Sequence, residues 1–186
     1  VFETRKNMNA YTLISGAALG SEKKFGEEAE KYGIAEVNFT FDGHDDHRDR
    51  GLKVLNTDDL AKSCVSLHEV SNIMHRKYPD TPTFKKILQT IWFLVEEGEE
   101  IFVIGKILPD NTIKGGTGWA AEFAKQSNKP LFVFDQEQDS WFEWNSNQWQ
   151  EAIDLKITKS RFTGTGSRNL RENGIKAIEE LFKNSF

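Results

Sequence analysis

The chain has 186 residues, which is enough for one globular domain and short for two. Its 14 Phe and 5 Trp residues can build a core, so wholesale disorder is excluded, and no apolar run approaches the roughly 20 residues that span a membrane. A net charge of -5 argues against nucleic-acid binding, and a lone cysteine excludes an intramolecular disulfide and a cysteine-based zinc site. We therefore expect one cytoplasmic domain over residues 1–186, without a membrane partner.

Strands and helices alternate along the first half of the chain. Gly33 and Gly98 follow apolar periodic stretches, as is usual where helices end. Asn56 precedes a run of polar and acidic residues, which is typical of a helix start. In chain order, we expect a strand at residues 11–14, a helix at 22–32, a strand at 37–41, a polar loop at 42–50, a helix beginning at 56 and a helix over 84–95.

The second half of the chain continues the alternation of strands and helices until a Trp-rich stretch interrupts it. A Trp-rich, polar stretch over residues 141–149 predicts an edge hairpin or a packed loop. Short loops between alternating strands and helices favour a mainly parallel sheet with helices on both faces, a three-layer α/β fold. The remaining expected elements are strands at 101–107, 131–134 and 157–162, a helix at 116–126, and a last helix with Ile175, Ile178, Leu181 and Phe182 on one face.

Three glycine-rich stretches, at residues 15–22, 114–122 and 162–168, lie at expected strand-to-helix turns. Glycine allows a ligand to approach the backbone closely, and free N–H groups at a helix start attract anions. The loops could converge on one phosphate-bearing ligand, or each could be only a tight turn. None matches the P-loop or the full dinucleotide fingerprint, so we expect no NAD and no other cofactor. The candidate ligand-binding residues are Ser15, Gly16, Gly20, Ser21, Gly115, Gly116, Thr117, Gly118, Gly164, Gly166, Ser167 and Arg168.

The second glycine loop carries a family resemblance. Residues 115–122 (Gly-Gly-Thr-Gly-Trp-Ala-Ala-Glu) resemble the Gly-Gly-x-Gly-Thr-x-x-Glu signature of the LOG family, lysine-decarboxylase-like proteins that act as nucleotide phosphoribohydrolases. Here Trp119 stands in place of the family's Thr, and a Lys precedes the glycine pair in place of Pro. The wider group is the SLOG superfamily of Rossmann-like folds.

The other two loops resemble motifs of that superfamily. Residues 15–22 are similar to its Ser-Gly-Gly-Ala-x-Gly-x-Asp loop, with Ala17 in place of the second Gly and Glu22 near the acid. Residues 164–168 are similar to its Gly-Ser-Arg strand end, which usually comes first in the chain. Because it comes last here, the chain resembles a circularly permuted member, similar to uncharacterised phage-associated proteins with the same order.

The resemblance implies a nucleotide or nucleotide-derived ligand and a homodimer, and it leaves two activities open. One is hydrolysis of an N-glycosidic bond, with Glu122 near the ribose and Arg76 or Arg168 on the phosphate. The other is non-catalytic sensing or sequestering of a nucleotide-derived signal. Glu122 lies one helical turn after the last glycine of its loop, so we expect it on the loop's face. Arg76 belongs to a basic stretch similar to the Arg-Lys pair of LOG enzymes, or to a solvated helix end.

Two further features allow alternative interpretations. The run from His44 to His47 (His-Asp-Asp-His) has metal-ligand residue types, but an exposed polar loop explains it, and we assign no metal site. Trp119 could stack on a nucleobase or pack in the core. The Trp-rich stretch at 141–149 predicts packing or a dimer contact rather than a ligand platform.

Overall fold

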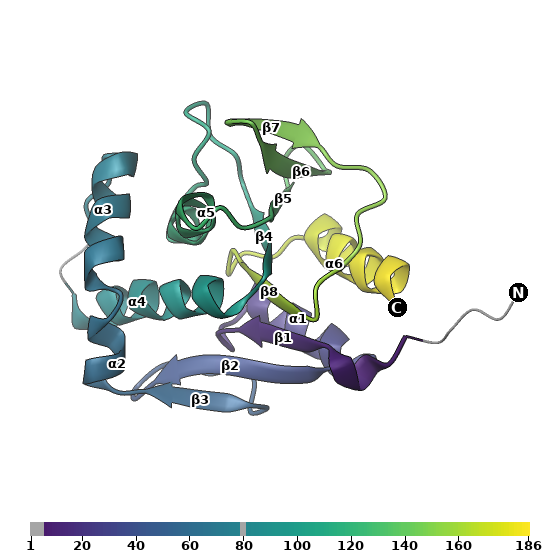
Figure 1. The fold of residues 1–186 in the computed structure, drawn as a ribbon, viewed down its shortest axis with the longest axis horizontal. Coiled ribbons are helices and arrows are strands. Elements are labelled where there is room, and N and C mark those ends of the chain that lie inside the picture. Colours follow the sequence, from purple (N-terminus) through teal and green to yellow (C-terminus); the bar gives the residue numbers. More distant parts are fainter. Residues whose placement is uncertain (1–5, 79–80) are drawn as a thin grey trace, which may run out of the picture.

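The computed structural model describes residues 6–78 and 81–186 (Figure 1). An eight-stranded sheet forms its centre. The six strands from β3 to β5 in sheet order run parallel, whereas β6 pairs antiparallel with β5, and β7 pairs antiparallel with β6. In sheet order the strands are β3 (Leu52–Leu55), β2 (Ala35–Phe41), β1 (Thr12–Ser15), β8 (Arg161–Gly166), β4 (Glu100–Gly105), β5 (Leu131–Asp135), β6 (Ser140–Asn145) and β7 (Gln148–Glu151).

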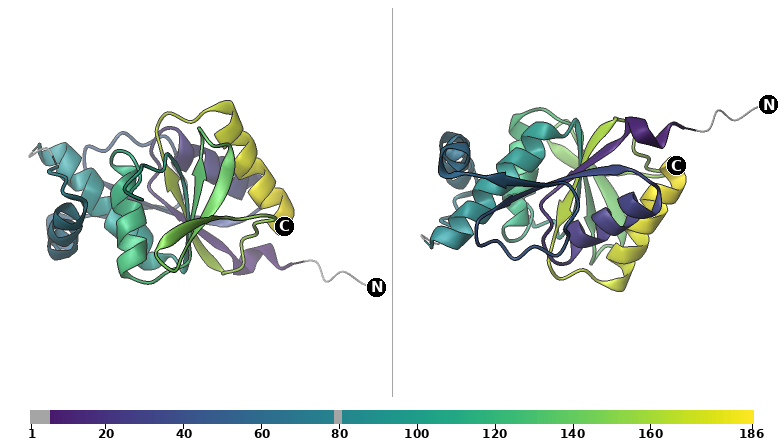
Figure 2. Two further views of the ribbon diagram at one scale, coloured as in Figure 1. Left: turned by 90° about the horizontal axis from the view of Figure 1, so that it is seen from above. Right: turned by 90° about the horizontal axis from the view of Figure 1, so that it is seen from below.

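Helices cover both faces of this sheet, so the predicted three-layer α/β architecture is confirmed. Figure 2 shows the C-terminal helix, in yellow, on the opposite side of the sheet from the teal helices of the middle of the chain. The first face carries α1 (Ser21–Lys31) and α6 (Glu172–Ser185), and the second carries α2 (Thr57–Ala61), α3 (Cys64–Met74), α4 (Pro82–Glu97) and α5 (Thr117–Gln126). A short 3-10 helix, Met8–Ala10, precedes β1.

Strand β4 shows why the molecule has a core on each face of the sheet. All six of its residues are buried, as expected for a strand covered on both sides. Because side chains alternate along a strand, Ile101 and Val103 join the core under α3, α4 and α5, whereas Phe102 and Ile104 join the core under α1 and α6.

The C-terminal strand β8 lies at the centre of the sheet, where it pairs with β1 on one side and β4 on the other. Gly164 is required within it, because a Cβ atom there would lie 2.4 Å from the ring of Phe25 on α1. Since parallel strands end at one edge of a sheet, the loops that follow β1, β8 and β4 lie side by side.

Three sequence predictions differ from the structure. The last strand begins at Arg161 instead of residue 157, because Ile157 is buried in the preceding loop, where its N–H donates to Ser185 Oγ. Strand β3 was not predicted, since only Leu55 of its four residues is buried and the hydrophobic pattern is weak. The helix expected from Asn56 breaks into α2 and α3 around Ser63. Of the two alternatives for residues 141–149, an edge hairpin or a packed loop, the structure shows the edge hairpin, formed by β6 and β7.

Candidate functional site

A cleft of about 470 Å³ opens at the carboxyl edge of the sheet, between the glycine loops and α4. Segments that follow β1, β2, β4, β5 and β8 contribute to its walls. The chain runs outward from β1 to β2 in one direction and from β4 to β5 in the other, with β8 between them. Ligands of open α/β sheets bind in the crevice at such a reversal of strand order.

All three predicted glycine loops reach this cleft. Of the twelve candidate ligand-binding residues, seven line it: Gly16, Gly115, Gly116, Thr117, Gly166, Ser167 and Arg168. The N–H groups of residues 115–117, at the start of α5, donate no hydrogen bond within the described part of the chain. Such groups at a helix start favour an anion, so of the three loops this one provides the clearest anion-binding position.

Three other predicted residues join the first loop to the third. The hydroxyl of Ser15 donates to the carbonyl of Gly164 at 2.6 Å, and the hydroxyl of Ser21 donates to the carbonyl of Ser167 at 2.7 Å. Gly20 has a φ of +87°, and a Cβ atom there would lie 2.4 Å from the carbonyl oxygen of Arg168. Ser15, Gly20 and Ser21 do not line the cleft; they hold its loops together.

Gly118 also has a packing role within the second loop. A Cβ atom at this position would lie 2.4 Å from the carbonyl oxygen of Ile113 and 2.5 Å from Arg76 Nη1. Arg76 itself donates to the carbonyls of Ile113 and Gly115 and to the hydroxyl of Thr112, at 2.7, 3.3 and 2.6 Å. Arg76 therefore holds the loop and does not line the cleft, where its predicted role would place it.

The cleft is basic although the whole chain is acidic. Lys106, Lys114, Arg168 and Arg171 line it, against the carboxylates of Glu22 and Glu137. Glu137 lies 2.8 Å from Lys106 Nζ and 3.8 Å from Arg171 Nη2. The side chains of Arg168 and Lys114 make no hydrogen bond or ion pair among the described residues, so two cations remain available to an anionic ligand.

The opposite wall of the cleft is apolar. Helix α4 contributes Phe84, Ile87, Ile91 and Leu94 to it. A ligand in this cleft would therefore meet cations and free backbone N–H groups on one side and hydrocarbon on the other. The sequence predicted α4 correctly from an apolar stripe that includes Phe84, Ile87 and Ile91, but that spacing alone could not show that part of the stripe faces a cleft.

Glu22 is the buried acid of the cleft. Its carboxylate accepts hydrogen bonds from the hydroxyl of Thr165 at 2.7 Å and from the N–H of Ala18 at 3.0 Å. Burial raises the pKa of this carboxyl above its ordinary value. The two hydrogen bonds and the charges of nearby His44 and Arg168 oppose that rise in pKa without cancelling it.

His44 lies on the same cleft, in the loop after β2. Its Nδ1 is 2.6 Å from Asp46 Oδ1, an oxygen that also accepts from the hydroxyl of Thr40 at 2.7 Å. The other two residues of the His-Asp-Asp-His run contact each other, with His47 Nε2 3.1 Å from Asp45 Oδ2. Within residues 6–78 and 81–186, no group of three or more His, Cys, Asp or Glu side chains could hold a metal ion.

Glu122, the predicted catalytic acid, is not at the cleft. Its carboxylate is buried beside Lys125 Nζ, at 2.7 Å, and the same ammonium donates to the carbonyl of Asn111 and lies 4.0 Å from the ring centroid of Trp144. The expectation that Glu122 lies on the ligand-binding side of the glycine loop is thus wrong, because its carboxylate is paired with Lys125, whose ammonium contacts Trp144 of the β6–β7 hairpin. Its predicted role in catalysis has no support in this geometry.

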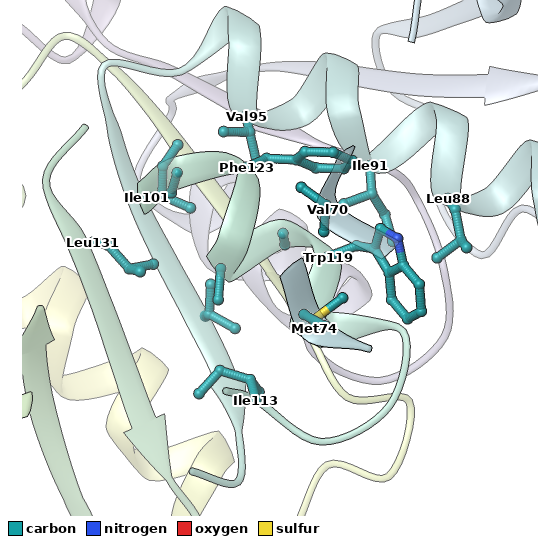
Figure 3. Packing of buried hydrophobic residues seen from close by; sticks show 14 of the residues in the cluster. Val70, Met74, Leu88, Ile91, Val95, Ile101, Ile113, Trp119, Phe123 and Leu131 are labelled. Carbon is teal, nitrogen blue, oxygen red and sulfur yellow. The ribbon is translucent and has the colours of Figure 1, made fainter. Parts of the chain in front are cut away.

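Trp119 packs in the core and is only 3% exposed. Figure 3 shows its indole among Met74, Ile91 and Leu88. Of the two interpretations of this residue, the structure supports core packing and not stacking on a base. The Trp-rich stretch also packs, since Trp144 and Trp149 meet edge to face on the hairpin, at a centroid distance of 5.0 Å.

Comparisons with known proteins bear on the fold. No known family and no curated protein matches the chain. Among solved structures, it is similar to a crystal structure described as "Putative molybdenum carrier protein" from Syntrophus aciditrophicus SB, with a TM-score of 0.55, 15% sequence identity and 95% of each chain covered. No helix of the described residues is long and apolar enough to cross a membrane. At this identity the likeness shows a shared Rossmann-like fold alone, which is compatible with the resemblance to the SLOG superfamily.

Proposed function

We propose that the protein binds a nucleotide or nucleotide-derived phosphate ligand in the cleft at the carboxyl edge of its sheet. The observation that carries this proposal is the pairing of a cationic, N–H-rich wall with an apolar wall across a space of about 470 Å³. That volume lies in the range of small-molecule sites, which are mostly apolar with a few well-placed polar groups.

We propose that the phosphate of the ligand binds at the loop before α5. The free N–H groups of residues 115–117 would donate hydrogen bonds to the phosphate oxygens, and the positive end of α5 would attract their charge. Arg168 would add a two-pronged contact and Lys114 a point charge, because neither has another partner among the described residues. The space beside this loop is open, because a Cβ atom at position 116 would have its nearest neighbour, Leu88, 3.8 Å away.

The base end would lie against α4. Phe84, Ile87 and Ile91 offer an apolar surface to a flat heterocycle, and the hydroxyl of Thr90 is the polar side chain that α4 adds to the lining. The likeness to a protein described as a molybdenum carrier supports small-molecule binding in general terms. The motifs that resemble the SLOG superfamily favour a nucleotide in particular. The homodimer that this resemblance implies is a separate prediction, which sedimentation of the full chain tests.

Thermal unfolding with nucleoside monophosphates tests the proposal. A ligand at 100 times its Kd stabilises the folded state by about 2.7 kcal/mol, which corresponds to roughly 5–10 °C for a chain of this size. Replacing Gly116 with Val should abolish the shift, because a branched side chain would cover the N–H groups. Arg168→Met should reduce it strongly, whereas the control Arg161→Met removes an equal charge from the opposite edge of the sheet and should leave it unchanged.

Mass spectrometry of small molecules that co-purify with the full chain would identify the natural ligand. A nucleotide or nucleotide derivative is expected in the wild type and absent from Gly116→Val. A ligand response that persists in both Gly116→Val and Arg168→Met would place the site elsewhere and contradict the proposal.

A further inference from the structure

Glu22 brings a carboxylate without a bound cation to the wall of the cleft. The residue is buried, yet its side chain lines the cleft. Among the described residues it forms no ion pair, and the charges of His44 and Arg168 act on it from a distance. Burying a carboxylate without a cation in contact costs free energy, so its retention at a cleft indicates a ligand group that it binds.

Each oxygen of this carboxylate already has one donor within the protein. Oε1 accepts from the hydroxyl of Thr165 at 2.7 Å, and Oε2 accepts from the N–H of Ala18 at 3.0 Å. Because a carboxylate oxygen has two acceptor positions, one remains on each oxygen. Gly16 also lines the cleft, and a Cβ atom there would lie 2.6 Å from Oε2, so the lack of a side chain leaves that oxygen accessible. Glu22 therefore offers the ligand two adjacent acceptors in a fixed position.

Two adjacent acceptors distinguish guanine from the other nucleobases. On its Watson–Crick edge, guanine carries two neighbouring donors, N1–H and N2–H, which match the two oxygens of a carboxylate. Adenine and cytosine place an acceptor beside their amino group, and uracil has a single donor between two acceptors. An acceptor that faces a carboxylate leaves both groups unpaired, which costs binding free energy. Burial raises the pKa of Glu22, and two N–H donors from a ligand would lower it again, because they stabilise the charged form.

The sheet separates Glu22 from the anion-binding loop by a suitable distance. Glu22 follows β1 and residues 115–117 follow β4, with β8 between these two strands. Two interstrand spacings amount to about 10 Å, which is comparable to the distance between the phosphate and the far edge of the base in a nucleotide. Helix α4 packs across β2, β1 and β8, so its apolar wall flanks the space between the two positions.

We infer that Glu22 selects guanine nucleotides, by accepting hydrogen bonds from N1–H and N2–H of a base whose phosphate binds at residues 115–117. The inference rests on the proposed function, because the phosphate must bind at that loop for the base to reach Glu22. It assigns the buried acid of the cleft to base recognition.

Titration calorimetry of the full chain with four nucleotides tests the inference on the wild type alone. GMP carries both donors, IMP lacks the 2-amino group, AMP has an acceptor at N1, and 2′-deoxy-GMP keeps the base but lacks a ribose hydroxyl. GMP should bind about tenfold more tightly than IMP and about 100-fold more tightly than AMP, because hydrogen bonds to a charged group are lost in turn. The Kd of 2′-deoxy-GMP should match that of GMP.

Glu22→Gln should reverse the preference. The amide oxygen can still accept from Ala18, and the amide NH₂ can donate to the hydroxyl of Thr165, so both contacts within the protein are kept. The variant then presents one acceptor and one donor, which match the N6–H and N1 of adenine. We expect GMP to bind about tenfold or more weakly than to the wild type, and AMP to become the preferred ligand. A merely structural role of Glu22 would not reverse the order.

Glu27→Gln is the matched control. It removes the same charge from an exposed position of the same helix, where Glu27 Oε1 lies 3.8 Å from Lys23 Nζ. The ratio of the Kd values for GMP and AMP should equal that of the wild type. Because the comparison of the four nucleotides needs no variant, the inference stays testable if Glu22→Gln does not fold.

The outcomes separate this inference from the proposed function. Equal wild-type affinity for GMP, IMP and AMP would overturn guanine selection and leave nucleotide binding standing, as would a Glu22→Gln variant that still prefers GMP. If 2′-deoxy-GMP binds tenfold more weakly than GMP while IMP binds as tightly, the carboxylate binds ribose hydroxyls and the inference is wrong. Absence of binding of all four nucleotides would overturn the proposed function and this inference with it.

Discussion

The first and second glycine loops look alike in sequence but carry their glutamates differently. Each follows a strand of the parallel sheet and leads into a helix. Glu22 is the second residue of α1, whereas Glu122 is the sixth residue of α5. Helical side chains lean toward the N-terminus of their helix, so an acid in the first turn reaches back over the loop. Glu22 does so and contacts the N–H of Ala18, while Glu122 has turned away to Lys125.

The glycines of the two loops differ in the same way. In the first loop, Gly16 lies against the Glu22 carboxylate and Gly20 lies against the backbone of Arg168. In the second loop, Gly115 and Gly116 have open space where a Cβ atom would be, with nothing closer than 3.8 Å. The comparison teaches that the first loop is built to hold an acid and a neighbouring loop, whereas the second is built to leave backbone N–H groups accessible.

The largest effect expected from this difference is on stability at Gly20. Gly20→Ala combines a positive φ with a close contact to a carbonyl, and should lower the free energy of unfolding by about 3–4 kcal/mol. Gly33→Ala is the matched control, because Gly33 has a φ of +70° but no atom within 4 Å, and it should cost about 1 kcal/mol. Urea unfolding measures both, and equal losses would contradict the packing interpretation of the first loop.

Glu122 should be important for stability and not for the ligand. Glu122→Gln leaves Lys125 buried without its carboxylate, although Asn111 and Trp144 still contact the ammonium. We expect a loss of about 2 kcal/mol in the free energy of unfolding. The thermal shift produced by nucleoside monophosphates should be the same size as in the wild type. If Glu122→Gln instead kept the stability of the wild type and lost the thermal shift, Glu122 would belong to the ligand-binding site.

Asp135 offers an intermediate, pH-dependent effect at the same edge of the sheet. Burial alone would raise the pKa of Asp135, but hydrogen bonds from Ile107, Glu137 and Gln138 hold it below its ordinary value of 3.8. The ionised form therefore stabilises the fold above about pH 4, and this stability is lost as the pH falls through the lowered pKa.

Asp135→Asn should accordingly be about 1–2 kcal/mol less stable than the wild type at pH 7, and the two proteins should converge in acid. Denaturant unfolding between pH 3 and pH 7 measures the difference, and the other carboxylates cancel because both proteins share them. A gap that stays constant with pH would mean that Asp135 acts through packing rather than through its charge.

The smallest effect concerns Glu22, and its sign is opposite. Because the pKa of Glu22 is raised in the folded state, its contribution to stability is fully present below its unfolded pKa, near 4.5, and is lost as the pH rises through the folded pKa. Glu22→Gln, which cannot ionise, should thus gain stability relative to the wild type between acid and neutral pH. A relative loss over that range would show that the ionised carboxylate stabilises the fold.

Much of this fold could be predicted from local patterns, and the site only in part. The periodicity of residues 84–95 and the glycine that follows predicted α4, and the Trp-rich stretch predicted the hairpin, because each signal is contained within one element. The exposed strand β3 has no such signal. His44 was noticed only as one of a run of metal-type residues, since nothing local shows that Asp46 orients it or that it faces a cleft.

By itself, the sequence determined the alternation of strands and helices and the glycine junctions between them, because hydrophobic period and backbone freedom are local properties. The tertiary structure alone decided which junctions meet. Strand β8 enters the middle of the sheet and brings the third loop between the first two. It also decided which acid lines the cleft, because the direction of a glutamate depends on its position in a helix and on what the helix packs against. Glu22 and Glu122 differ in both respects, and of the two only Glu22 lines the cleft.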